Sequence, residues 1–336
     1  MKLVVCFDGS WNEVSTRTNV WKLKQDIDCS GEADTQAKYI EGIGTVTGDE
    51  LLSGLFAADF KRPLGNGYRW LTKKMLNAPA NEEVKIYLFG FSRGGYLAHT
   101  MSWLLSEVGV PRKFADAIPI AEAYADKDAK ALEELKKGGT IPSPRIEMLG
   151  LWDAVTSPND IYKGYHDGLR AANVKNIFHA LAIDEKRKLF GAMQYLPGEG
   201  IAQRWFSGVH KDVGGGYPED ECELSDVTLD WMKRNAIQCG LKFRSSLSEV
   251  RSAYDFSALK KIHNEETALD PIENRIYREG EDIDESVRDR VKTQLGYFPA
   301  IAELPLRMVN WLKSLGDIER KLGCNLGHVM SDTRSQ

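Results

Sequence analysis

A serine flanked by glycines, in the stretch Gly90-Phe91-Ser92-Arg93-Gly94, is the part of the sequence whose residue types most directly suggest chemistry. Apart from one lysine, residues 84–89 before it are β-branched, aromatic or aliphatic, and apolar residues recur at helical spacing after it. A G-x-S-x-G motif between a strand and a helix is typical of a nucleophile elbow, a sharp turn that exposes the serine hydroxyl. The glycines let strand and helix approach, and the Arg93 N–H at the start of the helix could hold an oxyanion. The alternative is an ordinary glycine-rich turn with a solvated serine.

A serine nucleophile needs a histidine as base and a carboxylate that orients the base. In one large class of hydrolases these residues occur in the order Ser, Asp or Glu, His, each after a strand. Ser92, Asp153 and His210 occur in this order, and each follows a segment that reads as a strand. The conjunction favours a catalytic triad, although Asp153 alone could belong to a turn. His263 is the alternative base, and His179 is interpreted as a packing residue.

A second polar loop, Asp8-Gly9-Ser10, follows the first predicted strand at residues 2–7. In open α/β sheets, ligands bind at this carboxyl edge of the strands. We expect Gly9 or Ser10 to supply the second oxyanion N–H, with Asp8 ordering the loop by accepting backbone hydrogen bonds. A plain turn capped by Asp8 is the alternative. Close to His210, Asp212 is expected to support the site.

The predicted elements that must position these residues alternate between strands and helices. Strands are predicted at 2–7, 37–40, 84–89, 145–151 and 202–206, and helices at 19–27, 65–76, 97–105, 114–137, 175–190 and 224–237. This alternation predicts an α/β fold with a doubly wound, mostly parallel sheet. Beyond residue 240 the sequence is charge-rich with weak periodicity. We therefore expect a catalytic domain over residues 1–240 and a helical appendage or lid over residues 241–336, packed on the same domain.

An apolar segment within the expected appendage, residues 298–312, contains Phe298 and Trp311 and is interrupted by two prolines. A segment broken in this way could fold over the sheet edge beside Ser92 and form an apolar wall for acyl chains. Plain packing within the appendage is the alternative interpretation.

Composition narrows the function classes. The chain has 336 residues, 42% hydrophobic and 28% charged, which is typical of a soluble globular protein. Its net charge of −5 argues against a general nucleic-acid binder. Five cysteines without a C-x-x-C motif indicate plain thiols in a reducing compartment.

No apolar run approaches the roughly 18 residues of a membrane span. The apolar run Leu3–Phe7 is too short for the core of a signal peptide. We therefore expect a chain that is cytoplasmic as synthesised, without a cleavable signal, and a signal-independent secretion route stays open. The sequence does not predict the oligomeric state.

Five blocks of the sequence resemble, in order, those of a known family. They are Phe7-Asp8-Gly9-Ser10-Trp11-Asn12, Gly42-Ile43-Gly44-Thr45, Gly90-Phe91-Ser92-Arg93-Gly94, Leu151-Trp152-Asp153-Ala154-Val155 and residues 205–217, which begin Trp205-Phe206-Ser207-Gly208-Val209-His210. The sequence is similar, over roughly residues 1–240, to the α/β-hydrolase family that includes the catalytic domain of type VI secretion phospholipase effectors. The resemblance implies a triad of Ser92, Asp153 and His210. It also implies hydrolysis of a carboxylic ester or a phospholipid without a metal. We expect a small-molecule or lipid ester as substrate and no cofactor, and peripheral membrane contact stays open.

Two other function classes remain open from the sequence. A metal-dependent phosphoesterase could use Asp8, Asp153, His210 and Asp212, because carboxylate oxygens and imidazole nitrogens bind divalent ions. This interpretation leaves the G-x-S-x-G motif unexplained. A non-catalytic binding module could keep a hydrolase fold with a relic triad, although all three triad residues are present.

Overall fold

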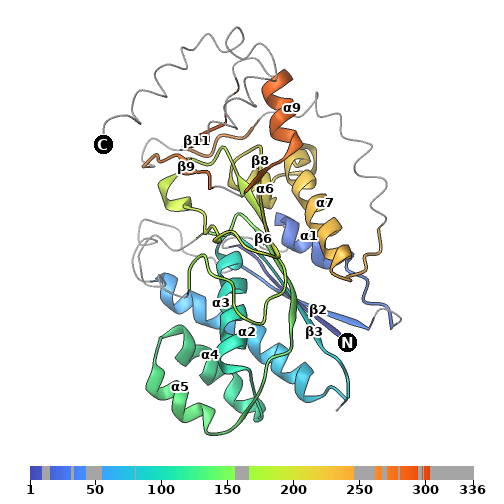
Figure 1. The fold of residues 1–336 in the computed structure, drawn as a ribbon, viewed down its shortest axis with the longest axis vertical. Coiled ribbons are helices and arrows are strands. Elements are labelled where there is room, and N and C mark those ends of the chain that lie inside the picture. Colours follow the sequence, from blue (N-terminus) through green and yellow to red (C-terminus); the bar gives the residue numbers. More distant parts are fainter. Residues whose placement is uncertain are drawn as a thin grey trace.

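The computed structural model describes residues 1–9, 16–31, 34–42, 55–79, 81–155, 166–245, 262–266, 271–278, 281–293, 297 and 299–302. Its centre is a seven-stranded sheet (Figure 1). In spatial order the strands are β2 (Thr35–Ile40), β1 (Lys2–Phe7), β3 (Lys85–Phe91), β6 (Ile146–Trp152), β7 (Ile177–Ala182), β8 (Ile201–Phe206) and β10 (Asp282–Ile283). Every neighbouring pair in this sheet is parallel. The fold is therefore α/β and α/β-hydrolase-like, as the sequence predicted.

Helices cover both faces of the sheet (Figure 1). One face carries α2 (Leu55–Leu76), α3 (Arg93–Val108) and α4 (Ala117–Ala125), and the other carries α1 (Asn19–Asp26) and α7 (Glu223–Gln238). The remaining helices are α5 (Ala129–Lys136), α6 (His210–Gly214) and α9 (Glu285–Thr293), with 3₁₀ turns at Phe114–Asp116, Lys188–Phe190 and Glu219–Glu221. Two short ladders join β4 (Val110–Pro111) to β5 (Thr140–Ile141) and β9 (Arg275–Ile276) to β11 (Ile301–Ala302).

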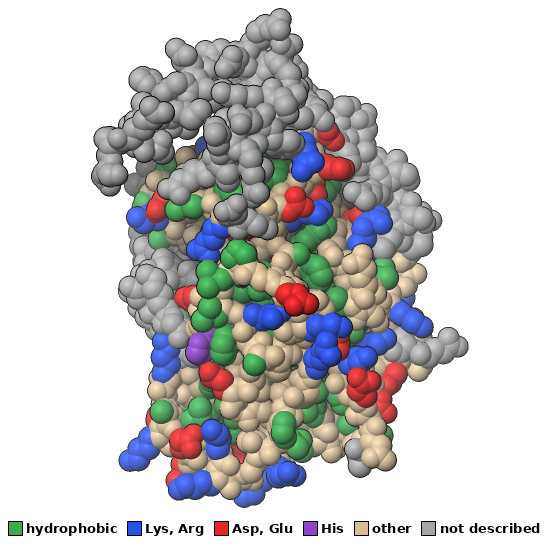
Figure 2. Space-filling view, in the orientation of Figure 1, with side chains coloured by type: hydrophobic (Ala, Val, Ile, Leu, Met, Phe, Trp, Pro, Cys, Tyr) green, Lys and Arg blue, Asp and Glu red, His purple; other side chains and the backbone are tan. Residues whose placement is uncertain are grey.

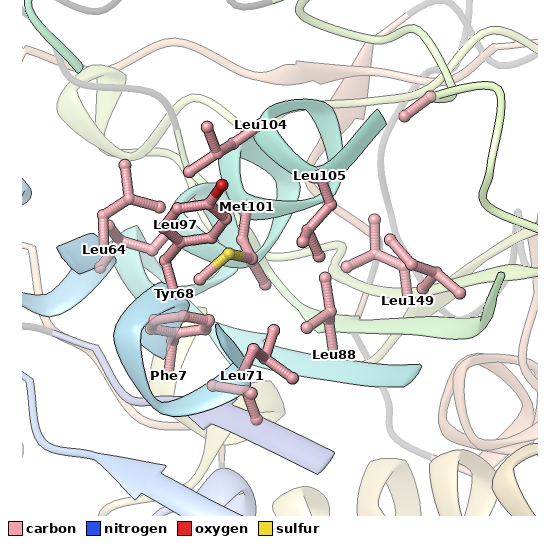
Figure 3. Close-up of a cluster of buried hydrophobic side chains, with 14 of the residues drawn as sticks. Phe7, Leu64, Tyr68, Leu71, Leu88, Leu97, Met101, Leu104, Leu105 and Leu149 are labelled. Atoms are coloured by element: carbon pink, nitrogen blue, oxygen red, sulfur yellow. The ribbon is translucent and has the colours of Figure 1, made fainter. Parts of the chain in front are cut away.

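The core beneath the α3 face fixes the helix that begins directly after Ser92. Successive strand residues point to opposite faces, so Phe7 and Leu88 face α2 and α3 while Cys6 and Phe89 face α1 and α7. In Figure 3, Tyr68 of α2 and Met101 of α3 lie in the cluster that covers Phe7 and Leu88. These side chains are fully buried, which makes α3 a rigid support for the turn before it.

The chain reverses its direction across the sheet at β1, which lies between β2 and β3. Such a switch point is where open α/β sheets place ligands, at the carboxyl ends of the strands. Asp8 follows β1 and Ser92 follows β3, so the fold brings these two predicted residues to adjacent strand ends.

The helix predicted at residues 175–190 is wrong. This stretch contains strand β7, and only Lys188–Phe190 forms a short 3₁₀ turn. β7 lies between β6 and β8, and five of its six residues are buried. A central parallel strand that is covered on both faces is apolar throughout, so its sequence does not alternate and resembles a buried helix.

A helical appendage was predicted beyond residue 240, but the described residues there also form strands. Besides α9 they contain β10, which extends the main sheet beside β8. Ile283 and Val287 pack with Leu181 and Trp205 of the sheet in one buried cluster. This part of the chain therefore extends the main sheet and packs on it. Of the predicted lid, Phe298 and residues 303–312, including Trp311, lie outside the described residues.

Charged side chains of both signs are interspersed with hydrophobic ones over the described part of the face in Figure 2. None of the described helices is long and apolar enough to span a membrane.

Candidate active site

Ser92 occupies a strained turn between the last residue of β3 and the first residue of α3. Its φ of 58° and ψ of −130° are rarely adopted by a residue with a side chain. The turn leaves no room for a side chain at Gly90 or Gly94. A Cβ added at Gly90 would lie 2.3 Å from the carbonyl oxygen of Gly94, and a Cβ added at Gly94 would lie 2.3 Å from that of Phe7. The sharp strand-to-helix turn that the motif predicted is therefore present.

The strand register places Asp153 next to Ser92. Phe91 and Trp152 are paired in β3 and β6, and the Ser92 N–H donates to the Trp152 carbonyl at 3.0 Å. Asp153 follows Trp152 with a φ of 39° and is fully buried. Ser92 and Asp153 thus lie at the ends of neighbouring strands, on the edge of the sheet where a ligand is expected.

His210 completes the group as the first residue of α6. Its Nδ1 donates to Oδ2 of Asp153 at 2.7 Å, which leaves Nε2 with a lone pair. The ring is held between Phe91, at a centroid distance of 4.6 Å, and Phe190, at 4.9 Å. Since Phe91 directly precedes Ser92, this packing brings the imidazole to the serine turn. No hydrogen bond joins Ser92 to His210 within the described structure, and such bonds often tighten only when substrate is bound.

Arg275, which the sequence did not single out, pairs with Asp153. Its Nη1 lies 2.5 Å from Oδ1 and its Nη2 lies 2.9 Å from Oδ2. Burial alone would raise the pKa of Asp153, but the charge of Arg275 and the hydrogen bonds from His210 and Arg275 hold it well below its usual range. The carboxylate is therefore ionised throughout the neutral range and can orient the imidazole.

His179 is a packing residue, in agreement with the sequence interpretation. It is fully buried on β7, and its Nε2 accepts the Ala154 N–H at 3.0 Å. Burial lowers the pKa of His179 to about 4, so the ring is neutral near pH 7. The bond to Ala154 fixes the backbone directly after Asp153.

Asp8, directly after β1, accepts one backbone N–H, as expected for it, and two side-chain hydroxyls. Asp8 accepts the Gly9 N–H at 2.7 Å, the Thr18 hydroxyl at 2.6 Å and the Tyr39 hydroxyl at 2.5 Å. Asp8 abuts the serine turn, because a Cβ on Gly94 would lie 2.4 Å from the Asp8 carbonyl oxygen. Gly9, one of the two predicted oxyanion donors, uses its N–H for Asp8. Ser10 lies outside the described residues.

Asp212 stabilises the start of α6, and its other carboxylate oxygen is bound to His263. Oδ2 of Asp212 accepts the Val209 N–H at 3.0 Å, just before His210, and Oδ1 lies 2.6 Å from Nδ1 of His263. Nε2 of His263 lies 3.1 Å from Glu221. Partial burial opposes protonation of His263, but the two carboxylates outweigh it and raise its pKa. His263 is therefore bound away from Asp153, which argues against it as the base.

The metal-ligand interpretation receives no support from the geometry. Asp8, Asp153 and Asp212 each bind different partners: hydroxyl groups, Arg275 and His263, respectively. Within the described ranges, no group of three or more His, Cys, Asp or Glu side chains is placed to hold a metal ion. Asp153 and His210 contact each other, but the four described candidate ligands do not converge on one point.

Fold and site together define an α/β-hydrolase-like protein with a serine, a histidine and an aspartate at one sheet edge. The chain belongs to the family described as "T6SS, Phospholipase effector Tle1-like, catalytic domain", whose model matches residues 1–235. Arg275 and His263 lie beyond the matched residues.

One curated protein and two solved structures are similar to this chain at low sequence identity. An uncharacterized protein of Saccharomyces cerevisiae is 24% identical over an alignment of 227 residues, which covers 58% of this chain and 33% of that protein. The crystal structure of an uncharacterized protein from Pseudomonas aeruginosa has a TM-score of 0.45 at 17% identity, over 75% of this chain and 48% of that one. The structure of the Tle1 effector bound to the VgrG spike from the Type 6 secretion system has a TM-score of 0.40 at 17% identity, over 65% and 51%. This chain thus spans about a third of the yeast protein and about half of each solved chain.

Proposed function

We propose that this protein is a serine ester hydrolase that cleaves phospholipids through Ser92, His210 and Asp153. The observation that carries the proposal is the 2.7 Å hydrogen bond between His210 and Asp153, beside a serine in a strained turn. Membership of a phospholipase effector family supports the lipid substrate. The same membership supports the expected signal-independent delivery and peripheral contact with a membrane surface.

The reaction begins when Oγ of Ser92 attacks the ester carbonyl carbon. Nε2 of His210 accepts the hydroxyl proton, and ionised Asp153 stabilises the imidazolium that forms. The oxyanion would be held by the N–H of Arg93 and by a second N–H from the loop after β1, that of Gly9 or Ser10. Collapse of the tetrahedral intermediate breaks the ester C–O bond. His210 then gives its proton to the leaving alcohol, and the acyl group remains on Ser92.

The second half of the reaction releases the fatty acid. A water molecule attacks the acyl carbon while His210 accepts one of its protons. When this intermediate collapses, Oγ of Ser92 leaves and takes the proton back from His210. The enzyme is restored, and the net change is hydrolysis of one ester bond without a cofactor.

Fatty-acid release from phospholipid vesicles tests this proposal. Wild-type protein should be active with a chelator present, whereas Ser92→Ala should lose most activity, up to about 10⁶-fold for a residue that acts as part of a unit. Ser102→Ala is a matched control, since Ser102 is a buried serine of α3 whose hydroxyl donates to the backbone carbonyl of His99. Loss of activity on chelation would favour the metal-dependent alternative. No activity in the wild type would favour the binding module.

A further inference from the structure

The guanidinium of Arg275 makes all of its described hydrogen bonds at the sheet edge that carries Asp153. Besides the two oxygens of Asp153, it donates to the carbonyl of Ala182 at 2.9 Å and to the carbonyl of Phe190 at 2.6 Å. The residue is 8% exposed. These four contacts fix the plane of the guanidinium, and a planar fork is the geometry that recognises a carboxylate through two parallel bonds.

The fork determines which way the Asp153 carboxylate faces. Oδ1 accepts Nη1 of Arg275 and the Ala182 N–H at 2.9 Å. Oδ2 accepts Nη2 of Arg275 and Nδ1 of His210. With both oxygens held, the carboxylate is oriented with Oδ2 toward the imidazole. Without Arg275, a fully buried carboxylate would keep only His210 and one backbone N–H as partners.

We propose that Arg275 is a positioning residue of this active site, which holds the Asp153 carboxylate toward His210 and makes the segment beyond residue 235 a required part of the catalytic unit. The inference rests on the proposed serine mechanism. Its distinguishing feature is that the arginine acts on the reaction through Asp153 and does not contact substrate.

The other charged groups around the pair have partners of their own. Glu185 accepts the His210 N–H at 3.2 Å and is paired with Arg187 at 2.8 Å. Within α6, Asp212 is paired with His263. On β7, His179 is neutral because burial lowers its pKa to about 4. Arg275 is therefore the cation that contacts Asp153 directly in the described structure.

Removing this positive charge should favour the protonated, inactive form of His210. The acidic limb of the pH profile of kcat/KM reports when the base of the free enzyme becomes available. In Arg275→Met this limb should move to higher pH, because the one described cation in contact with Asp153 is then absent. A purely structural role would lower the melting temperature or the active fraction without moving the limb.

The test compares Arg275→Met, Arg275→Lys and Arg278→Met with wild type on a soluble ester. Arg278 is a matched control because it is an exposed arginine of the same segment that donates to a backbone carbonyl. For Arg275→Met we expect the acidic limb of the kcat/KM profile to move to higher pH. We also expect kcat to fall by about 10- to 100-fold, as for other residues that orient a functional side chain without contacting substrate. Arg275→Lys should keep the limb near its wild-type position with a smaller loss, and Arg278→Met should match wild type.

An unshifted limb with kcat within about twofold of wild type in Arg275→Met would overturn the inference. If that variant does not fold, Arg275→Lys carries the test, and wild-type kcat in this variant overturns the inference because lysine lacks the fork. Ser92→Ala, measured in parallel, separates the two claims. If Ser92→Ala is active, the proposed function fails; if it is inactive while the arginine variants behave as wild type, only the inference fails.

Discussion

At the scale of single residues, the hydrogen-bond and ion-pair partners of each side chain in the site limit what that side chain can do. Asp153 is held ionised by Arg275, so in the proposed mechanism it orients the imidazole of His210 and does not act as an acid. His210 is fixed at Nδ1 by that carboxylate, which leaves Nε2 for the serine. His263 has two carboxylate partners of its own. This division predicts different outcomes for the two histidines.

His210→Ala should reduce ester hydrolysis as much as Ser92→Ala, and the double variant should be no worse, because members of a triad act as a unit. His263→Ala should keep most activity, since His263 supports α6 only through Asp212. Steady-state kinetics on one soluble ester measure all four proteins. A deeper loss in His263→Ala than in His210→Ala would mean that the base is misassigned.

Asp153→Asn should cost activity and also stability. An amide leaves His210 in place but can mis-set its tautomer, a change that costs up to about 10⁴-fold in serine proteases. From the triad alone, we would expect only this catalytic loss, which is smaller than the loss in Ser92→Ala or His210→Ala. The structure adds a buried Arg275 that would lose its counter-charge. Thermal unfolding should therefore show a lower melting temperature for Asp153→Asn than for Ser92→Ala, and equal melting temperatures would contradict the pairing.

At the scale of elements, the sequence predicted the parts that carry motifs better than the parts that only pack. The strand before Ser92 and the helix after it were predicted from their contrasting periodicities, and α1 and α7 also follow the predicted ranges closely. β7 was predicted as a helix because its burial on both faces removes the alternation that marks a strand. Its role in the site, where the Ala182 N–H binds Asp153, was therefore not predicted.

β7 also carries a pH-dependent contribution to stability through His179. Folding lowers the pKa of this residue from 6.5 to about 4, because burial opposes the charge. Between these values the unfolded chain binds more protons than the folded one, so stability falls as the pH falls. For this residue the loss between pH 7 and pH 5 should be about 2 kcal/mol.

His179→Gln removes this titration and can still accept the Ala154 N–H. Urea unfolding of both proteins at pH 7 and pH 5 isolates the contribution of His179, since other titrating groups are common to both. The variant should lose less stability than wild type over this interval. An equal loss in the two proteins would show that His179 does not titrate as its burial implies.

At the scale of the whole molecule, the site is assembled from regions far apart in sequence. Ser92, Asp153 and His210 each follow a strand, and this pattern could be predicted because parallel strands end at one edge. Arg275 could not be predicted in this way. It lies 122 residues from Asp153 in a charge-rich region without a motif, and nothing local distinguishes it from neighbouring arginines.

A chain shortened to residues 1–240 tests this integration. It would lack Arg275 and β10. It would also expose apolar side chains of the sheet such as Leu181 and Trp205, which share a buried cluster with Ile283 and Val287. We expect lower thermal stability, a tendency to aggregate and loss of activity. A shortened chain with wild-type kcat and melting temperature would mean that residues 1–240 form a complete catalytic domain and that the C-terminal contacts are dispensable.

The central claim is that Ser92 is the nucleophile, and the most direct measurement is the position of a covalent adduct. The protein is treated with a fluorophosphonate ester until hydrolysis stops, then digested and analysed by peptide mass spectrometry. Our account predicts one phosphonate per chain, on Ser92, with a rate that a chelator does not change and that falls sharply in His210→Ala. An adduct on another residue, or complete hydrolysis with Ser92 unmodified, would contradict the account.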